Sequence, residues 1–309
     1  MKPVKASVLI VTYNHAAYIE RALTSVVEQK TDFDFEIIIS EDASTDGTTE
    51  IVRRFASDHP DRVRLILSET NVRSNAVVRR GFEAARGDYV ALVDGDDFWT
   101  SPEKLARQVA VLDADPALSL CFTNATVVDE KGEASGRLWT PLEKDERLPL
   151  STFWQGNPFA TCGSLFRRAS VPEIPQWYDG FFPVTDWPLY ILFAQRGDIA
   201  YLHQPMGAYR LHSGGLFSAQ DAAKKLGTMD MLFRRLEDCL DPKYRVDIRA
   251  GHNRYFLDWA KEFLNQGQTV LARQSLGHFW RHRAATGIFP RREETKLGVR
   301  MCLRRIFGT

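Results

Sequence analysis

The segment DYVALVDGDDFWTSPEKLARQ, residues 88–108, decides the fold because a strand, an acidic turn and a helix follow one another within it. Residues 89–93 form an apolar run that is typical of a strand with both faces covered. Three carboxylates, Asp94, Asp96 and Asp97, come directly after this run. Ionised carboxylates so close together repel one another and resist burial. The acidic turn therefore belongs at the open end of a strand, where a ligand or solvent offsets its charge.

The same alternation of strand and helix signals runs through the first 130 residues. Strands are expected at residues 7–13, 35–40, 62–69, 88–93 and 118–128. Amphipathic helices are expected between them, at residues 16–29, 44–59, 75–86 and 101–116. This order predicts an α/β fold with a mostly parallel central sheet flanked by helices. Ligands bind such sheets at the carboxyl ends of the strands, so polar residues just past each strand are candidates for a site.

The second half of the chain has a different pattern. Strands are expected at residues 161–168, 199–204 and 206–212, and a helix at 187–197, within otherwise irregular sequence. From residue 219 to the end the pattern is helical. We therefore expect a catalytic domain at residues 1–215 and a helical C-terminal region at residues 216–309.

Composition and charge exclude several classes of protein. Lys and Arg total 40, as do Asp and Glu, which gives no sign of a nucleic-acid-binding protein. Residues 273–309 nevertheless hold nine Lys or Arg against two Glu, a net charge of +7, which leaves −7 for the remainder. The four cysteines are far apart in the sequence, which argues against a zinc ribbon or a disulfide scaffold. This cysteine usage fits a protein of the reducing cytoplasm. The first residues read as a strand rather than a signal peptide, and no run of about 18 apolar residues predicts a membrane-spanning helix.

The acidic turn has the chemistry of a metal site. Asp94 and Asp96 are two residues apart, so in extended backbone their side chains point the same way. Two hard oxygen ligands suit Mg²⁺ or Mn²⁺, whose other positions are often filled by substrate phosphates. The alternative is a solvated turn that caps the next helix, because Asp and Gly are ordinary turn residues.

Five motifs, in order along the chain, resemble those of the family 2 glycosyltransferases, which have the Rossmann-like GT-A fold. They are VLIVTYNHAAYIERALTSVVEQ (residues 8–29), IIISEDASTDGT (37–48), ARGDYVALVDGDDFWTSPEKLARQ (85–108), VTDWPLYILFAQRG (184–197) and YRLHSGG (209–215). The resemblance extends over about two-thirds of the chain, up to about residue 215, and omits the helical region. The resemblance implies a nucleotide-diphosphosugar donor, for which we expect a UDP-sugar, and inversion at the anomeric carbon.

The resemblance also implies donor contacts at the strand ends. The expected donor-binding residues are Thr12, Tyr13, Asn14, Asp42, Arg73, Asp94, Gly95 and Arg210. Tyr13 would lie against the nucleobase, Asp42 would accept a hydrogen bond from the N3–H of a uracil-type base, and Gly95 would let the donor approach the backbone. Alternatives remain open for three of these residues: Tyr13 as a packed aromatic, Asp42 as a helix cap and Arg73 as a solvated surface residue.

Metal ligands and a catalytic base follow from the same resemblance. Asp96 is the expected direct ligand, and Asp94 would lie near the ribose or reach the metal through water. His212 is a further expected ligand and suits Mn²⁺ better than Mg²⁺; the other histidines have no ligand-like spacing. Asp97 is expected to cap a helix or to support the turn. Asp186 stands where the family carries the base that deprotonates the acceptor hydroxyl, and the alternative is a simple helix cap.

The acceptor side is marked by aromatic residues and by a basic tail. The aromatic residues either stack on a saccharide acceptor or form core beneath a long loop. They are Trp139, Trp154, Phe159, Trp177, Tyr178, Phe181 and Phe182. The tail, residues 290–309, reads as a basic amphipathic helix that either contacts an anionic membrane or packs on the acidic body.

These expectations combine into one function with two alternatives. The chain is expected to be a metal-dependent inverting glycosyltransferase that extends a glycan or lipid-linked glycan in bacterial cell-surface polysaccharide synthesis. It would act in the cytoplasm or peripherally on the inner membrane face. The first alternative is a sugar-nucleotide nucleotidyltransferase, which would carry a Gly-rich loop after the first strand; TYNHAAY holds no Gly. The second is a degenerate, nucleotide-sugar-binding subunit, although the acidic turn and Asp186 are both present.

Overall fold

The computed structural model describes residues 4–217, 219–286, 299 and 303. The chain separates into two compact units. The first contains the chain up to residue 150 together with residues 158–213, and the second contains residues 151–157 and the chain from residue 214. The sequence-based boundary near residue 215 falls close to this division but does not anticipate the segment 151–157. The basic tail expected at 290–309 lies outside the described residues, apart from Val299 and Leu303.

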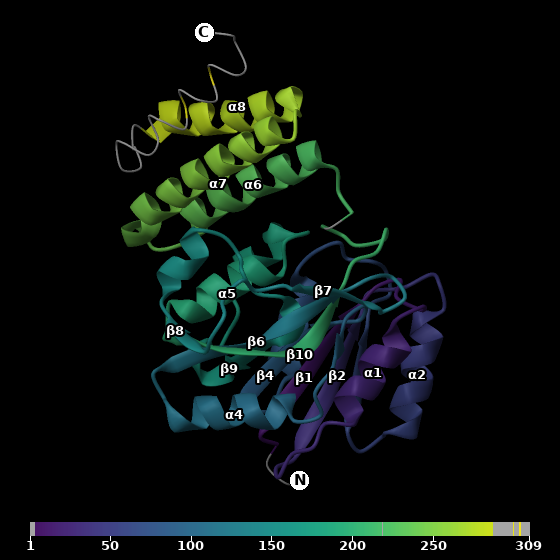
Figure 1. Cartoon of the computed structure of the whole chain (residues 1–309). Coiled ribbons are helices and arrows are strands. Elements are labelled where there is room, and N and C mark those ends of the chain that lie inside the picture. The colour runs from purple at the N-terminus through teal and green to yellow at the C-terminus, as the bar shows by residue number, and fades with distance from the viewer. Residues whose placement is uncertain (1–3, 218, 287–298, 300–302, 304–309) are drawn as a thin grey trace. The chain divides into compact units, whose positions relative to one another are not determined.

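A ten-stranded sheet forms the centre of the first unit (Figure 1). Its strands are β1 (Ala6–Thr12), β2 (Phe35–Glu41), β3 (Val63–Leu67), β4 (Tyr89–Asp94), β5 (Phe98–Trp99), β6 (Leu118–Val128), β7 (Ala134–Leu138), β8 (Glu146–Leu148), β9 (Ser164–Arg167) and β10 (Asp198–Arg210). The order across the sheet is β3-β2-β1-β4-β9-β6-β10-β5, with β7 paired to β6 and β8 paired to β10. The chain therefore has the predicted central sheet.

The sheet is parallel in its first half and mixed in its second. Strands β3, β2, β1 and β4 are parallel neighbours, as predicted. The fifth predicted strand, β6, does not adjoin β4, because β9 lies between them and is antiparallel to both. The two strands predicted at 199–204 and 206–212 are one strand, β10, with register shifts on either side of Pro205. Proline has no N–H to give to the ladder, which explains an irregularity at this point.

Helices pack around the sheet (Figure 1). They are α1 (Ile19–Val27), α2 (Thr48–Asp58), α3 (Ala76–Ala84), α4 (Lys104–Ala114) and α5 (Asp186–Ala194). Short 3-10 helices occur at η1 (Leu150–Trp154), η2 (Thr161–Gly163), η3 (Arg168–Ser170) and η4 (Gln176–Phe181). Every residue of β2 is buried, which is expected of a parallel strand covered on both faces.

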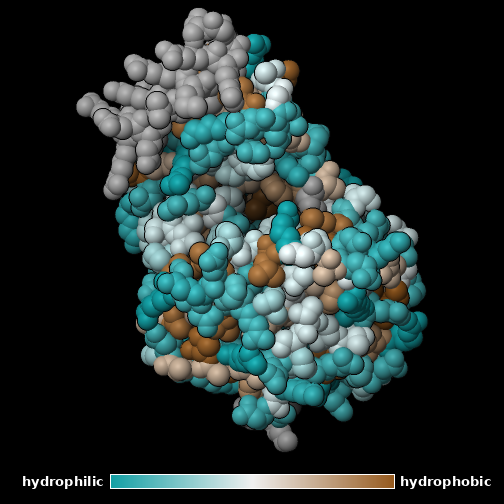
Figure 2. Space-filling model, in the orientation of Figure 1, coloured by the Kyte–Doolittle hydropathy of each residue, from teal (hydrophilic) through white to brown (hydrophobic). Residues whose placement is uncertain are grey.

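The second unit is built from helices. They are α6 (Ala222–Cys239), η5 (Pro242–Tyr244), α7 (Arg245–Asn265) and α8 (Thr269–Thr286). Leu232, Phe256 and Phe279, one from each long helix, are almost completely buried between them. None of the helices described in the structure combines the length and the apolar character needed to cross a membrane. The face of the molecule drawn in Figure 2 is largely hydrophilic, with apolar residues in small groups.

Candidate functional site

The acidic turn lies at the ends of β1 and β4. Val11 of β1 is level with Asp94, the last residue of β4, and the Gly95 N–H donates to the Val11 carbonyl at 2.8 Å. A Cβ added to Gly95 would lie 2.5 Å from Thr12 Oγ1 and 2.9 Å from His15 Nδ1. Such distances are too short for real Cβ contacts, so the backbone of the turn can approach β1 this closely only because residue 95 is glycine.

Two imidazoles converge on Asp96. His212 Nε2 lies 2.9 Å from Asp96 Oδ2, and His15 Nε2 lies 3.5 Å from the same oxygen. Burial opposes ionisation of Asp96, but the two imidazoles outweigh it, and the pKa of Asp96 is lowered. Burial lowers the pKa of His15 against the opposing effect of Asp96. Asp96 is therefore an ionised carboxylate with two imidazole nitrogens beside it.

Arg210, the last residue of β10, positions the acidic turn. Its main-chain N–H donates to Asp97 Oδ1 at 2.8 Å, and its Nε donates to the Asp96 carbonyl at 2.8 Å. Its Nη1 donates to the Glu130 carbonyl at 2.8 Å, and its guanidinium lies 4.8 Å from the centre of the Tyr18 ring. Arg210 is 4% exposed. The geometry thus gives its side chain main-chain partners within the protein, whereas the sequence predicted a donor contact.

Asp97 supports the turn and does not cap a helix. Helix α4 begins at Lys104 with Glu103 at its N-cap position, several residues beyond Asp97. Asp97 is 2% exposed. Burial and the charges of Asp96 and Asp94 raise its pKa well above the usual value of a carboxyl group. Of the two roles predicted for Asp97, the helix cap is therefore wrong.

The charge of Asp186 acts on Asp94 at the acidic turn. Burial, Asp96 and Asp186 raise the pKa of Asp94 to about 8, and a hydrogen bond with Thr161 partly offsets them. Burial raises the pKa of Tyr190 well above its usual value, and Asp186 and Asp94 add to the rise. Electrostatic effects of this kind need short separations, so the structure brings Asp186, from the start of α5, to the acidic turn at the end of β4.

Hydrogen bonds join the loops that follow β1 and β2. The Asn14 N–H donates to Ser44 Oγ at 2.9 Å, and Asn14 Oδ1 accepts from the Thr45 N–H at 2.8 Å. The His15 N–H donates to Thr48 Oγ1 at 2.8 Å. Asn14 has a positive φ of 54°, a conformation that Asn tolerates better than most residues. Asn14 therefore acts here as a link between two loops at the sheet edge.

Asp42 is held by a chain of side chains that ends at Arg80. Asp42 Oδ1 accepts from Ser68 Oγ at 2.7 Å and from the Val72 N–H at 3.1 Å. Arg80 Nη1 donates to Ser68 Oγ at 2.7 Å, and its Nε donates to Ser40 Oγ at 2.8 Å. Arg80 thereby orients the hydroxyl that orients Asp42. This arrangement replaces the predicted cap role for Asp42 with contacts to the loop after β3.

The remaining predicted donor residues lie along the same edge. Thr12 is 1% exposed, and its Oγ1 lies 3.3 Å from His15 Nδ1. Tyr13 is half-buried. Arg73 is exposed and has a positive φ of 44°, and its N–H donates to Asn71 Oδ1 at 2.9 Å. The structure therefore leaves Arg73 accessible, as both of its predicted roles require.

Two residues of the site were missed by the sequence analysis. His15 was set aside because its spacing from other histidines is not ligand-like, yet it directly follows the strand-end residues Thr12 to Asn14. Counting one more residue past the first strand as a candidate site residue would have included it. Arg80 lies inside α3, and no local pattern shows that its side chain reaches the end of β2.

The predicted aromatic cluster is mostly core. Trp154, Phe159, Tyr178 and Phe181 are each 7% exposed or less. The Phe122 and Phe159 rings stack with centroids 4.1 Å apart. Trp139, Trp177 and Phe182 are half-buried and could still meet a ligand. The core alternative therefore holds for the four buried residues.

Comparison with known proteins places this site in a family. The model of the family described as glycosyl transferase family 2 matches residues 7–174. The chain belongs to this family. The match includes the acidic turn, Asp42 and His15, whereas Asp186 and His212 lie beyond it.

Several family 2 relatives and solved structures are similar to the chain. An uncharacterized protein of Mycobacterium tuberculosis is 37% identical over 212 residues, which cover 68% of this chain and 60% of the relative. The chain thus spans only 60% of the length of that protein. A Bacillus subtilis protein, TuaG, is 31% identical over 225 residues, 71% of this chain and 84% of TuaG; its name assigns it provisionally to teichuronic acid biosynthesis as a glycosyltransferase.

Solved structures share the fold. The S. aureus protein TarS, residues 1–349 in complex with UDP-GlcNAc, has a TM-score of 0.63 at 20% identity, covering 90% of this chain and 81% of that one. The mannosyltransferase PcManGT of Pyrobaculum calidifontis, in complex with GDP-Man and Mn²⁺, has a TM-score of 0.55 at 20% identity, covering 97% and 80%. These similarities confirm the predicted GT-A fold.

The residues of the turn fit a divalent cation. Asp96 offers a carboxylate, and His212 and His15 offer imidazole nitrogens beside it, a donor set that suits Mn²⁺. Within residues 4–217 and 219–286, no three such side chains are already arranged as a complete metal site. A half-built site of this kind is what Mg²⁺ or Mn²⁺ uses when phosphate oxygens of a substrate supply the other ligands.

Proposed function

We propose that the chain is a metal-dependent inverting glycosyltransferase that moves a sugar from a nucleotide-diphosphosugar, a UDP-sugar, to a hydroxyl of a glycan or glycolipid. We place this reaction in bacterial cell-surface polysaccharide synthesis, in the cytoplasm or peripherally at the inner membrane face. Family membership and the meeting of Asp186 with the acidic turn support the reaction. The relationship to TuaG supports the pathway, and the free cysteines among the described residues suit a reducing compartment.

In this mechanism the two acidic positions have different tasks. Asp186 accepts the proton of the acceptor hydroxyl as its oxygen attacks the anomeric carbon. Asp96, with His212, would hold the cation, which would supply positive charge for the departing diphosphate. Asp94 lies between these two positions and faces the donor ribose. Attack from the face opposite the leaving group inverts the anomeric configuration.

A single observation carries the assignment of the base. Asp186 is in the first turn of α5, directly after Thr185 at the N-cap position, and its Oδ1 accepts from the Trp187 N–H at 2.7 Å. The carboxylate therefore contacts the start of the helix as well as acting on the acidic turn. Its charge contributes to the raised pKa of Asp94 at the end of β4, which supports a position of Asp186 beside the acidic turn. A carboxylate that faces the acidic turn from another element is suitably placed to receive an acceptor proton.

The substitution Asp186→Asn tests the base. We expect turnover to fall by roughly 10²- to 10⁴-fold while donor binding is retained, because only the proton acceptor is removed. Asp198→Asn is the matched control, since Asp198 is an exposed acid that pairs with Arg147 at 2.7 Å. Near-wild-type turnover of Asp186→Asn would remove Asp186 from the role.

Thermal shifts with UDP, GDP and their sugars, each with Mn²⁺ and with Mg²⁺, test the donor. A ligand that binds the folded state raises the melting temperature with its concentration. A UDP-specific, metal-dependent rise is expected. The absence of a shift with any nucleoside diphosphate would contradict the donor assignment.

A further inference from the structure

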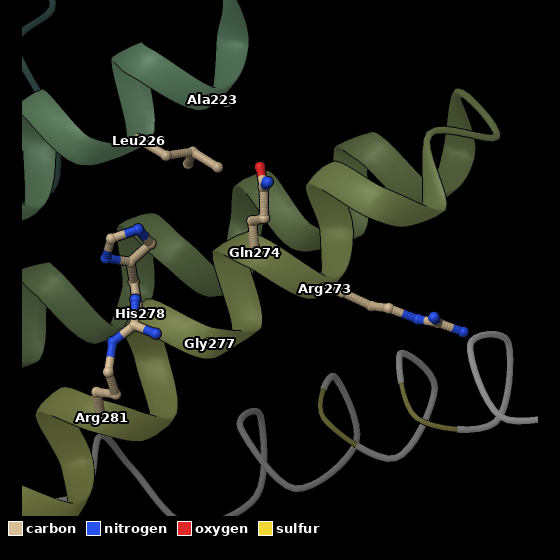
Figure 3. Close-up of a pocket in the computed structure, with 7 residues that line it drawn as sticks. All are labelled: Ala223, Leu226, Arg273, Gln274, Gly277, His278 and Arg281. Carbon is tan, nitrogen blue, oxygen red and sulfur yellow. The ribbon is translucent and has the colours of Figure 1, made fainter.

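The side chains that line the pocket between α6 and α8 do not converge on one ligand. The pocket has a volume of about 420 Å³ and is lined by Ala223, Leu226, Arg273, Gln274, Gly277, His278 and Arg281. In Figure 3, Arg273 points away from Leu226. Arg281 Nη1 lies 3.5 Å from the position of a Cβ added to Gly277, so this arginine covers the glycine. Buried polar groups do converge at another place, on the chain just before α5 in the first unit.

The chain before α5 is held from α3 by Asn75. Asn75 occupies the N-cap position of α3, yet its side chain makes no cap hydrogen bond there. Its Nδ2 instead donates to the Tyr178 carbonyl at 3.3 Å and to the Val184 carbonyl at 3.0 Å. Its main-chain N–H donates to the Asp179 carbonyl at 3.2 Å. An N-cap asparagine usually satisfies its own helix, so this side chain serves the chain before α5 rather than α3.

Tyr178 holds the residue that follows Val184. Its hydroxyl donates to the Thr185 carbonyl at 2.7 Å, and its own carbonyl is one of the two that accept from Asn75. Asn75 and Tyr178 are both 0% exposed, so water has little access to replace their hydrogen bonds. The carbonyls of the two residues directly before Asp186 are therefore both held by this pair of side chains.

Asn75 also follows closely on the loop that contacts Asp42. The N–H of Val72, three residues before Asn75, donates to Asp42 Oδ1 at 3.1 Å, and Arg73 is exposed. One short stretch of chain after β3 thus contacts the proposed donor edge at its start and the carbonyls before Asp186 at its end. The position of Asp186 relative to the donor edge then depends on Asn75.

We propose that Asn75 and Tyr178 are positioning residues for sugar transfer, which hold the start of α5 so that Asp186 meets the acceptor hydroxyl. The proposal rests on the proposed function, in which Asp186 is the base. Both side chains are buried, so they act through Asp186 and not on the reactants. A base has to lie within hydrogen-bond reach of the proton it takes, and a displacement of about 1 Å can lower a rate about 100-fold.

Tyr178→Phe tests the proposal by removing one hydroxyl. Tyr201→Phe is the matched control, because Tyr201 is 1% exposed and its hydroxyl donates to the Leu142 carbonyl at 3.2 Å. The readout is UDP release from UDP-GlcNAc, UDP-glucose and UDP-galactose, each with Mn²⁺. We expect kcat of Tyr178→Phe to fall roughly ten-fold at an unchanged KM for the donor, and Tyr201→Phe to keep both. In the Asp186→Asn background, Tyr178→Phe should lower kcat no further, because its effect passes through Asp186.

Hydrogen exchange at the start of α5 gives a second readout that needs no substrate. The Trp187 N–H donates to Asp186 Oδ1 at 2.7 Å, so its exchange reports on the carboxylate. We expect exchange there to become roughly ten-fold faster in Tyr178→Phe and in Asn75→Ser, and to stay unchanged in Tyr201→Phe. Serine at position 75 is still a good N-cap residue, so α3 is retained.

Three results would overturn the positioning roles. They are equal losses of kcat in Tyr178→Phe and Tyr201→Phe, unchanged exchange at the start of α5, and a further loss of kcat in the double variant. A loss in Asp186→Asn together with a normal kcat in Tyr178→Phe would overturn these roles and leave the base in place. Wild-type turnover of Asp186→Asn would overturn both. No UDP release by the unsubstituted chain would count against the proposed donor alone, because the exchange comparison is made without it.

Discussion

Histidines and carboxylates meet in both units of the protein, but the two clusters balance their charges in opposite ways. At the acidic turn, only Asp96 of the three acids contacts the two imidazoles, and the guanidinium of the nearby Arg210 donates to main-chain carbonyls. In the helical unit, Asp230 and Glu237 each pair with an arginine and lie beside a histidine. Asp230 pairs with Arg234 at 2.9 Å and with His252 at 2.8 Å.

The second acid of the helical cluster repeats this pattern. Glu237 forms an ion pair with Arg249 and lies 3.6 Å from His282 Nε2. A cluster that is neutralised internally contributes to stability and needs no ligand. At the acidic turn, burial and neighbouring acids raise the pKa of Asp94 and of Asp97, so a cation is needed before all three carboxyls ionise readily. The difference predicts which substitutions affect chemistry and which affect folding.

Asp96→Asn should produce the largest effect. Loss of the carboxylate that both imidazoles contact removes the proposed metal ligand, so we expect activity with Mn²⁺ to fall by at least about 10³-fold. The free energy of unfolding without metal should fall, because the lowered pKa of Asp96 means that the fold stabilises its charge, and His212 loses its partner. Activity assays and urea denaturation measure the two quantities. A large loss of stability without loss of activity would mean that the acidic turn, like the helical cluster, serves folding rather than chemistry.

Asp230→Asn should affect stability but not activity. Asp230 is the common partner of Arg234 and His252; Arg234 is about half exposed, whereas the fully buried His252 would lose its charged acceptor. We expect the free energy of unfolding to drop by about 1–2 kcal/mol, with transferase activity of the folded fraction unchanged. Asp238→Asn, at an exposed acid on the same helix, is the control and should change stability little. A loss of specific activity without a loss of stability would refute the structural role of the cluster.

Acid should weaken the helical cluster through its histidines. Burial and His252 lower the pKa of His282 from 6.5 to about 4, and Glu237 only partly opposes them. The unfolded chain therefore binds a proton at His282 between pH 6.5 and 4 that the folded chain does not bind, so stability falls as pH falls through this window. Between pH 8 and pH 5 we expect a loss of about 2 kcal/mol from this group.

Denaturant unfolding at several pH values measures that loss, and His282→Gln should remove its part of the pH slope. Arg234 also faces His282 and lowers its pKa, whereas Asp230 has a lowered pKa and stays ionised throughout the window. An unchanged slope in His282→Gln would assign the acid sensitivity to other groups.

Arg80→Lys should produce the smallest effect and concerns orientation rather than charge. Lysine keeps the positive charge but cannot hold Ser40 and Ser68 at once as the guanidinium fork does. We expect KM for the donor to rise roughly ten-fold with little change in kcat, because Asp42 loses the hydroxyl that orients it. Equal falls in kcat and in donor affinity would indicate a wider disturbance of the β2 end.

The local sequence predicts the first half of the sheet because each strand there is a continuous apolar run that ends in polar residues. Strand β9 could not be placed in the same way. Its four residues do not indicate which strands it pairs with, and its partners, Tyr89 to Ala91 in β4 and Phe122 in β6, lie far away in the sequence. The same limit applies to the site. Asp94, Asp96 and Asp186 were found from local motifs, whereas the hydrogen bond from the Arg210 N–H to Asp97 spans 113 positions.

The hydrogen bonds that join the loops after β1 and β2 have a kinetic consequence. Asn14 and His15 are tied to Ser44, Thr45 and Thr48 by the fold itself, so the conformational entropy of these loops is lost when the chain folds. A nucleotide that arrives at this edge meets a surface that is already ordered. Its association rate should then be set by diffusion and long-range charge attraction rather than by a loop rearrangement. Differences in affinity among nucleotides should arise mainly from their dissociation rates.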